Sequence, residues 1–305
     1  MIVGASARVA LVEIEGRKLT LRNLGKVLWP EPGLTKADLI NYYVEVSPYL
    51  LPHLRGRPFI MRPFPNGAGG RSYYRWELPD YAPAWLHHWV YEPRGEGRLI
   101  DMLVIDGLPE LIWAANQACI ELHPWLSRTD LPEYPDRALF DLDPGREAGF
   151  LACLEAAGWL HTTLQELGVR SYAKTSGRDG LHILVPLERR YLFREVRAWV
   201  QAVAREVVAA HPAVLTLDKD LQRRRGRVLI DYSQNGLGKS LVAPYSARAT
   251  PQATVSAPLT WEEVAAAQVR PTDFTLLTVP QRLRRIGDLL APLAEGQLLP
   301  QLPAR

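Results

Sequence analysis

The chain has 305 residues, of which 47% are hydrophobic and 23% are charged, and its formal net charge at pH 7 is +3. This length allows one large domain or two small ones at about 150 residues each, and the composition is typical of a folded globular protein. No apolar run approaches the roughly 20 residues of a membrane-spanning helix, and the first residues lack the apolar core of a secretory signal, so we expect a cytoplasmic protein without a membrane segment.

Cysteine and arginine usage adds two constraints. Cys119 and Cys153 lie in apolar segments without the spacing of a metal site, so we expect buried thiols and no zinc. The 36 basic residues are 30 arginines and 6 lysines. Arginine can hold a phosphate through two parallel hydrogen bonds, which suits a nucleic-acid enzyme. The same excess is typical of a GC-rich genome, and the net charge alone does not indicate a polyanionic partner.

The N-terminal third of the chain predicts one helix and a strand-rich segment. Residues 34–51 carry apolar side chains at helical spacing, and Thr35 with Asp38 forms a capping-box pattern at the start. Residues 58–76 contain short strand-like runs broken by proline and glycine turns, so we expect a hairpin with a loop. Residues 100–122 mix strand and helix patterns.

The middle of the chain predicts a sheet with two helices. The expected elements are, in order, a strand at 138–143, a helix at 146–167 ended by Gly168, strands at 169–175 and 181–187 joined by a turn at 176–180, a helix at 193–210 and a strand at 226–232. This order favours an α+β fold with a central, mostly antiparallel sheet and the helices on one face. Two further helices are expected at 260–267, with a second capping box, and at 280–290.

Three acidic residues stand at the ends of predicted strands. Asp141 and Asp143 are two apart, so both side chains point to the same face, about 6.6 Å apart along the strand. Such a pair can hold two divalent cations about 4 Å apart for phosphoryl transfer, or it can be a solvated turn. Asp231 ends another apolar strand, where burial requires a cation or a partner. That partner is either a metal ion or an arginine of the run at 223–227.

The turn between two of the predicted strands has the composition of a phosphate-binding loop. Its glycines let backbone N–H groups approach phosphate oxygens, while Ser176 and His182 supply side-chain donors. The simpler interpretation is a plain hairpin turn followed by a histidine at the edge of the core.

Four motifs, taken in order, resemble one known family. They are DLDPG at 141–145, KTSGRDGLH at 174–182, RRRGRVLIDYSQN at 223–235 and APYSAR at 243–248. Together they resemble the polymerase domain of bacterial ATP-dependent DNA ligase D, a primase-polymerase of the archaeo-eukaryotic primase superfamily. The segment 21–67, the motif IELHPW at 120–125 and PLTW at 258–261 resemble it too, so the resemblance extends over about 16–290.

The resemblance implies a domain organisation. We expect a single primase-polymerase catalytic domain over 1–295 with the primase-polymerase fold, followed by a C-terminal tail at 296–305. A part that binds DNA ends and a 5′-phosphate is expected at about 16–130, and the catalytic core at about 137–250.

The resemblance also implies roles for individual residues. Asp141, Asp143 and Asp231 match the catalytic carboxylates, which bind two divalent ions, with Mn²⁺ favoured and Mg²⁺ as the other candidate. The residues that match the nucleotide-binding set are His123, Ser176, His182 and Arg248, with Arg224 and Lys239 as weaker members.

A second set of residues matches contacts to DNA. Asn23, Lys26 and Lys36 match the site for the 5′-phosphate downstream of a gap, and the predicted helix start at Thr35 offers free N–H groups and a positive dipole end for it. The alternative is solvated surface charge. Tyr73 and Tyr74 match aromatics that stack on template bases. The alternative is a hairpin with one tyrosine in the core.

Two positions depart from the family pattern. Asp179 stands where relatives often carry lysine before the Gly-Leu-His sequence, which affects one expected triphosphate contact. Trp76 takes the place of a basic residue two positions after the paired aromatics, and Arg75 follows them directly.

The implied function is that of a DNA-directed DNA and RNA polymerase of the non-homologous end-joining type, which favours ribonucleotides. It would add NTP or dNTP to a primer 3′-hydroxyl at short gaps or synapsed double-strand breaks, next to a downstream 5′-phosphate. Ku and a separate DNA ligase are implied partners. The alternatives are a DNA-end bridging module with secondary polymerase activity and a primase that starts chains de novo. A two-metal nuclease would leave the nucleotide-binding set without a purpose.

Overall fold

The structure is a computed structural model that describes residues 3–6, 8–93, 95 and 97–301. The chain divides into two compact units. Unit 1 contains Met1–Trp125, Ser240–Ser256 and Phe274–Gly287, and unit 2 contains Leu126–Lys239, Ala257–Asp273 and Asp288–Arg305. Each unit is described by itself. The single domain expected over 1–295, and its internal division, remain predictions.

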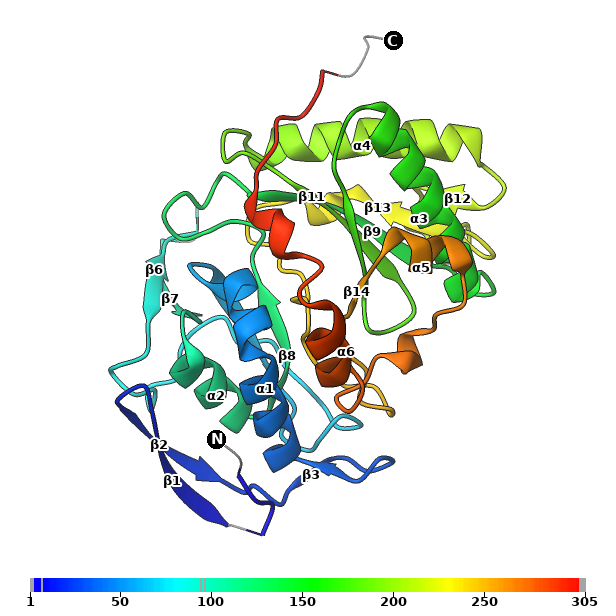
Figure 1. The fold of residues 1–305 in the computed structure, drawn as a ribbon. Helices are drawn as coiled ribbons and strands as arrows, with labels where there is room; N and C mark the ends of the chain where they lie inside the picture. The colour runs from blue at the N-terminus through cyan, green and yellow to red at the C-terminus, as the bar shows by residue number, and fades with distance from the viewer. Residues whose placement is uncertain (1–2, 7, 94, 96, 302–305) are drawn as a thin grey trace. The chain divides into compact units, whose positions relative to one another are not determined.

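Unit 1 is built from eight strands and three helices in its described residues. They are β1 (Val9–Ile14), β2 (Arg17–Arg22), β3 (Val27–Trp29), β4 (Leu34–Thr35), α1 (Lys36–Leu54), β5 (Pro58–Pro63), β6 (His88–Tyr91), β7 (Ile100–Val104), α2 (Leu108–Asn116), β8 (Cys119–Pro124) and α6 (Val279–Ile286). An antiparallel sheet has the order β6-β7-β5-β8, while β1 with β2 and β3 with β4 form separate two-stranded ladders. Figure 1 shows α1 and α2 beside this sheet.

The start of α1 confirms the expected capping box. Thr35 Oγ1 accepts from the backbone N–H of Asp38, and Asp38 Oδ2 accepts from the backbone N–H of Thr35 at 2.6 Å. The next two N–H groups are also used, since Lys36 donates to the carbonyl of Lys26 and Ala37 donates to that of Leu24. The expectation of free N–H groups at this terminus is therefore wrong, because the capping box uses two of these four groups and the loop before the helix uses the other two.

Unit 2 contains the sheet that was predicted for the middle of the chain. Its elements are β9 (Arg137–Pro144), α3 (Gly149–Glu166), β10 (Tyr172–Thr175), β11 (Leu181–Pro186), α4 (Phe193–Ala210), β12 (Leu215–Thr216), β13 (Val228–Asp231), β14 (Pro258–Leu259), α5 (Trp261–Ala266) and the 3₁₀ turns η1 (Tyr232–Gln234), η2 (Pro271–Asp273) and η3 (Ala291–Ala294). The strand order is β12-β13-β9-β11-β10-β14, and among the described strands only β12 and β13 pair in parallel. The α+β architecture is confirmed.

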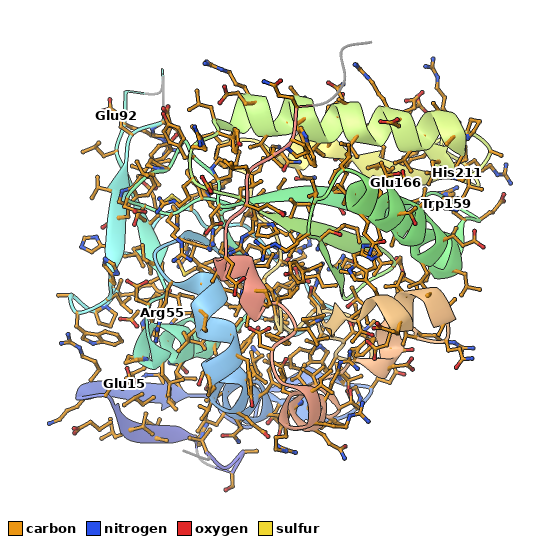
Figure 2. All side chains as sticks on the ribbon, turned by 45° about the horizontal axis from the view of Figure 1, so that its top comes forward. Glu15, Arg55, Glu92, Trp159, Glu166 and His211 are labelled. Atoms are coloured by element: carbon orange, nitrogen blue, oxygen red, sulfur yellow. The ribbon has the colours of Figure 1, made fainter. Side chains whose placement is uncertain are left out.

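Two helices cover one face of this sheet (Figure 1). Phe140 on β9 makes an edge-to-face contact with Trp199 on α4, and α3 packs on β9 with its buried Cys153 near the carbonyl of Leu142. Figure 2 shows Trp159 and His211 side by side where α3 meets the end of α4, and their rings stack 3.8 Å apart. Because side chains alternate along a strand, β9 presents its odd-numbered residues to the opposite face.

Several predicted boundaries are wrong for local reasons. The second arm of the hairpin expected at 58–76 is reduced to a bridge between Met61 and Arg75, because the turn residues pack against β3 instead. Gly67 has φ +79°, and a Cβ there would lie 2.7 Å from the carbonyl oxygen of Leu28. The helix expected at 280–290 is α6 and ends at Gly287, which has φ +69°. The short strand β12 was not predicted.

The end of the described chain is attached to unit 2. The side chain of Gln297 exchanges two hydrogen bonds with the backbone of Arg170, and Trp199 Nε1 donates to the carbonyl of Pro300. The expected tail at 296–305 is therefore held by hydrogen bonds at Gln297 and Pro300. Residues 302–305 lie outside the described residues. No helix in the described part of the chain has the length and apolarity to span a membrane.

Candidate active site

The three candidate carboxylates meet on the face of the unit 2 sheet that α3 and α4 leave uncovered. Asp141 and Asp143 are two apart on β9, and Asp231 on β13 is the direct cross-strand partner of Asp141. Directly opposed residues in an antiparallel pair have neighbouring side chains on one face. The backbone therefore brings the three acids together, as the sequence predicted, and we call this surface the carboxylate face.

Each of these carboxylates has a basic partner. Arg224 Nη1 lies 2.6 Å from Asp143 Oδ2, Lys219 Nζ lies 3.0 Å from Asp231 Oδ1, and His182 Nε2 lies 3.4 Å from Asp141 Oδ1. The arginine alternative for Asp231 is therefore wrong: Asp231 pairs with Lys219, and Arg224 of the run at 223–227 pairs with Asp143. Within the described residues, no three or more His, Cys, Asp and Glu side chains form a ready-made ion site.

The loop that carries Arg224 is held against the end of β9 by a glycine. A Cβ on Gly145 would lie 2.2 Å from the carbonyl oxygen of Arg224, so a side chain at this position would displace the loop. The backbone N–H of Gly145 donates to the backbone carbonyl of Arg227 at 2.8 Å. The glycine of the DLDPG motif is therefore required for the close approach of Arg224 to Asp143.

Opposing effects act on the pKa of Asp231. Burial raises this pKa, but hydrogen bonds from Ser233 and Lys219 outweigh burial and hold it below its ordinary value. The carboxyl is therefore ionised at neutral pH. An ionised oxygen donor is what a hard divalent cation needs.

The predicted turn between β10 and β11 is confirmed. The backbone N–H of Ser176 donates to the carbonyl of Gly180, and Ser176 Oγ accepts from the N–H groups of Arg178 and Gly180, each at 3.2 Å. A Cβ on Gly180 would lie 2.3 Å from the carbonyl oxygen of Leu142, so this turn packs directly on β9. The Ser176 hydroxyl is therefore held in a turn that packs on β9 at Leu142, the residue between Asp141 and Asp143.

A buried lysine orients His182. Lys174 is 0% exposed and is the cross-strand partner of His182, and its Nζ lies 2.8 Å from His182 Nδ1. An ammonium group can only donate, so Nδ1 accepts and the ring proton of a neutral imidazole lies on Nε2, which faces Asp141. Asp231, Asp141, His182 and Lys174 thus form one row across four neighbouring strands.

A second charged cluster lies in unit 1, and we call it the Glu121 cluster. Glu121 is 0% exposed, and its carboxylate lies 2.5 Å from Arg62 Nη1, 3.1 Å from His123 Nε2 and 3.3 Å from Arg248 Nε. Burial raises the pKa of Glu121, but the hydrogen bond from His123 and the charges of Arg248 and Arg62 hold it far below its usual range. Burial lowers the pKa of His123.

Three comparisons with known proteins agree on the family. The family model for the primase-polymerase domain of LigD matches residues 35–290. The chain is 34% identical over 278 residues to the multifunctional non-homologous end joining protein LigD of Mycolicibacterium smegmatis and 33% identical over 272 residues to the bifunctional LigD of Bacillus subtilis. It is also similar to the polymerase domain of Mycobacterium tuberculosis ligase D in complex with DNA, with a TM-score of 0.84 and 32% identity over 92% of this chain and 99% of that one. The chain belongs to the LigD primase-polymerase domain family.

Family membership confirms the resemblance and the enzyme class. The chain is a primase-polymerase domain of the nucleotidyltransferase type, its curated relatives are named non-homologous end joining proteins, and the family is metal-dependent. The alignments cover 90% and 88% of this chain but only 36% and 43% of the two curated relatives. The chain thus spans well under half of the length of these LigD proteins.

Of the residues of this LigD-family domain that are expected to bind a 5′-phosphate, two line an open cavity and one is buried. Lys26 and Asn23 line a cavity of about 440 Å³ together with Ser6 and Arg8, two residues that the sequence did not single out. Lys36 is buried, its Nζ donates to the carbonyl of Arg22 at 2.8 Å, and burial together with Lys26 lowers its pKa to about 8. Lys36 is therefore not solvated surface charge.

The paired tyrosines are both exposed, so neither belongs to the core. Tyr73 is 46% exposed and Tyr74 is 54% exposed. Tyr74 meets His123 edge to face, and the guanidinium of Arg62 lies 4.9 Å from the centre of its ring. Arg75 lies over Tyr73 at 5.4 Å. Arg75 therefore places a basic group beside the paired tyrosines, although Trp76 occupies the position where the family pattern has a basic residue.

The remaining candidates are peripheral. Asp179 is exposed in the turn before His182, and Lys239 is exposed at the end of the turn that follows η1. The sequence reasoning missed four residues that shape the two charged groups: Arg62, Glu121, Lys174 and Lys219. Only Lys174 had a local signal, because a hairpin closed at 176–180 places it opposite His182.

Proposed function

We propose that this domain is a DNA-directed DNA and RNA polymerase of the end-joining type. It adds NTP or dNTP to a primer 3′-hydroxyl at short gaps or synapsed double-strand-break ends. The 3′-oxygen bonds to the α-phosphorus, the bond from that phosphorus to the β-phosphate oxygen breaks, pyrophosphate leaves, and the proton of the hydroxyl passes to a water molecule. The observation that carries this proposal is the placing of Asp141, Asp143 and Asp231 in register on one polar sheet face.

The carboxylate face has the donor chemistry for divalent ions. Its three carboxylates are oxygen ligands, and their charge is balanced by Arg224, Lys219 and His182. Two ions held by these carboxylates, with Mn²⁺ favoured over Mg²⁺, would activate the 3′-hydroxyl and neutralise the leaving pyrophosphate. Arg224 would then exchange Asp143 for a phosphate of the nucleotide, because a guanidinium binds either anion.

The nucleotide-binding residues have separate tasks. We propose that Ser176 and His182 donate to triphosphate oxygens next to the carboxylates, with His182 oriented by Lys174. In unit 1, Glu121 fixes the side chains of His123 and Arg248, so that the Arg248 guanidinium is positioned to bind a triphosphate oxygen and the His123 ring to contact the nucleotide. Lys239 is a weaker member of this set, since its exposed side chain must be drawn in by the nucleotide.

The DNA contacts fall in unit 1. Asn23 and Lys26, beside the cavity they line, and Lys36 would bind the 5′-phosphate downstream of a gap. The exposed rings of Tyr73 and Tyr74 would stack on template bases without regard to sequence. Ku and a separate ligase are the proposed partners for complete end joining.

Extension of a primer across a short gap with a downstream 5′-phosphate tests the proposal. NTPs and dNTPs are compared in Mn²⁺ and in Mg²⁺, with native protein, Asp143→Ala and, as a matched control, Glu147→Ala, an exposed acid paired with Arg225. We expect templated addition, faster with NTPs and Mn²⁺, that Asp143→Ala abolishes and Glu147→Ala retains. Addition by Asp143→Ala would refute the catalytic assignment.

Two further outcomes separate the alternatives. Product formed from nucleotides and template without any primer would identify a de novo primase. DNA bound and ends bridged, but no addition under any condition, would favour the end-bridging module.

A further inference from the structure

An open pocket in unit 1 lies between β2, α2 and the loop that follows Trp76. Its volume is about 440 Å³, which is large enough for a nucleobase with its sugar. The lining residues on which the argument depends are Lys18, Arg22, Tyr81, Trp85 and Gln117. We call it the β2–α2 pocket, and Figure 1 locates the two elements.

The β2–α2 pocket combines cations with aromatic faces. Alternation along β2 buries Leu19 and Leu21 and leaves Lys18 and Arg22 exposed. The guanidinium of Arg17, on the same strand, lies 5.9 Å from the ring centre of Trp85. Tyr81 is 64% exposed. Cations beside accessible aromatic rings are the side chains that bind single-stranded nucleic acid, because phosphates pair with the charge and bases stack on the rings.

The adjacent hollow has the opposite charge. Pro83 contributes to both, but the second hollow is lined by Glu77, Asp80 and Asp101. None of the described residues that line the β2–α2 pocket is acidic. Although His88 pairs with Asp101 and Arg98 with Glu77, acidic residues outnumber basic ones in the lining of the second hollow, so a polyanion is favoured in the β2–α2 pocket over its neighbour.

Arg75 connects the β2–α2 pocket to the paired tyrosines. Its guanidinium lies over Tyr73 at 5.4 Å, and its Nη1 donates to Tyr81 Oη at 3.1 Å. Tyr81 Oη in turn lies 3.3 Å from Gln117 Oε1, at the end of α2. An aromatic and basic surface therefore continues from Tyr73 to the pocket.

We propose that the β2–α2 pocket binds an unpaired nucleotide of the single strand that leaves Tyr73 and Tyr74. Trp85 and Tyr81 offer faces for the base, and Lys18 and Arg22 neutralise its flanking phosphates. The inference rests on the proposed DNA-directed function, whose template contacts it extends. Because stacking does not read base edges, the pocket accepts any sequence.

The test is fluorescence anisotropy with a labelled duplex that is either blunt or carries a single-stranded overhang of about eight nucleotides. It uses no nucleotides or metal ions. Lys18→Glu with Arg22→Glu removes the cations, and Arg205→Glu, on the exposed side of α4 in unit 2, controls for charge reversal. Trp85→Ala removes the ring, and Trp85→Phe retains an aromatic face if the alanine variant folds poorly.

We expect native protein to prefer the overhang substrate. The double variant should lose that preference. The slope of its log affinity against log salt concentration should also be shallower than that of the native protein by about 1.4, since each of the two lost phosphate contacts to a single strand contributes about 0.7. Trp85→Ala should bind the overhang about tenfold more weakly, with Trp85→Phe in between. Arg205→Glu should change neither the preference nor the slope.

Two results would overturn the inference. One is an unchanged preference for the overhang in the double variant and in Trp85→Ala. The other is an equal loss for blunt and overhang DNA. Failure of native protein to extend a primer would instead contradict the proposed function, and the anisotropy measurement would still report on the pocket.

Discussion

Glu121 in unit 1 and Asp143 in unit 2 both pair with arginine, but they differ in exposure and in the number of partners. Glu121 is fully buried and accepts from Arg62, His123, Arg248 and the backbone of Ala249. The side chain of Asp143 is 51% exposed and faces Arg224, whose buried Nε has no hydrogen-bond partner among the described residues.

This contrast separates a fixed charge from an exchangeable one. Removing one member of a buried, fully hydrogen-bonded group leaves uncompensated charges in a low dielectric, which is strongly destabilising. A half-exposed carboxylate is partly screened by water, so its own replacement changes stability less. The Glu121 cluster therefore positions its donors permanently, whereas the carboxylate face can exchange a protein cation for another cation.

The largest expected effect is on catalysis and should leave stability intact. Asp143→Asn should lower the rate of primer extension by at least about a thousandfold. The free energy of unfolding should change by less than about 1 kcal/mol, because the side chain is half exposed. Single-nucleotide extension measures the rate, and urea unfolding measures the free energy of unfolding. A large loss of both in Asp143→Asn would contradict the contrast between Asp143 and Glu121.

The next largest effect should be on stability, in contrast to the effect on catalysis at Asp143. Glu121→Gln leaves Arg62, Arg248 and His123 around a neutral side chain, and we expect the free energy of unfolding to fall by about 3–5 kcal/mol. Urea unfolding tests this, with Glu147→Gln as the matched control whose exposed pair with Arg225 should make no measurable difference. Equal stability of the two variants would show that the Glu121 cluster is not fixed.

A smaller effect is expected where a buried cation acts through another residue. Lys174→Met removes the group that holds His182 Nδ1, and extension should slow by about tenfold to a hundredfold, as for other positioning residues next to a metal site. The specific readout is a double-mutant cycle: in a His182→Ala background, Lys174→Met should add little. Additive losses would mean that Lys174 only supports the fold.

The smallest effect concerns pH and the buried lysine of unit 1. Burial and Lys26 lower the pKa of Lys36 to about 8, so the free protein loses this charge as the pH rises through 8. Preference for a 5′-phosphate over a 5′-hydroxyl at the gap should therefore fall several-fold between pH 7 and 9.5. Lys36→Arg, which stays charged, should keep the preference, and an unchanged native ratio would exclude Lys36 from the site.

The same lysine makes a prediction about stability. Because its pKa is lower in the folded state than the ordinary value of 10.5, the unfolded chain binds more protons between about pH 8 and 10.5. The contribution of Lys36 to the free energy of unfolding therefore rises with pH across this window. The difference in unfolding free energy between the native protein and Lys36→Met, followed from pH 7.5 to 10, should show that rise.

Signals that act over a few residues were predictable. The capping box at Thr35, the turn before His182 and the shared face of Asp141 and Asp143 all follow from spacings of two to six residues, and each is confirmed. The order of motifs then identified the family. The candidate carboxylates were brought together because strand alternation and register are regular.

Pairings between distant segments were not predictable. Glu121 meets Arg62 and Arg248 only because β5, β8 and the segment after Ser240 fold onto one another, and nothing in the local pattern distinguishes it from other acids. The partners of Asp143 and Asp231 depend on a loop held by Gly145. The expectation of free N–H groups at the start of α1 was wrong for a similar reason, since the preceding loop accepts from Lys36 and Ala37.

The row from Lys174 to Asp231 has a consequence for how the chain is made. Its members lie on β10, β11, β9 and β13, and β13 is the last of these to leave the ribosome. Pairing of β13 with β9 closes a long loop, which is a slow, high-contact-order step. A nascent chain therefore carries an incomplete carboxylate face until synthesis has passed Asp231, and it acquires all three acids only when β13 has paired with β9.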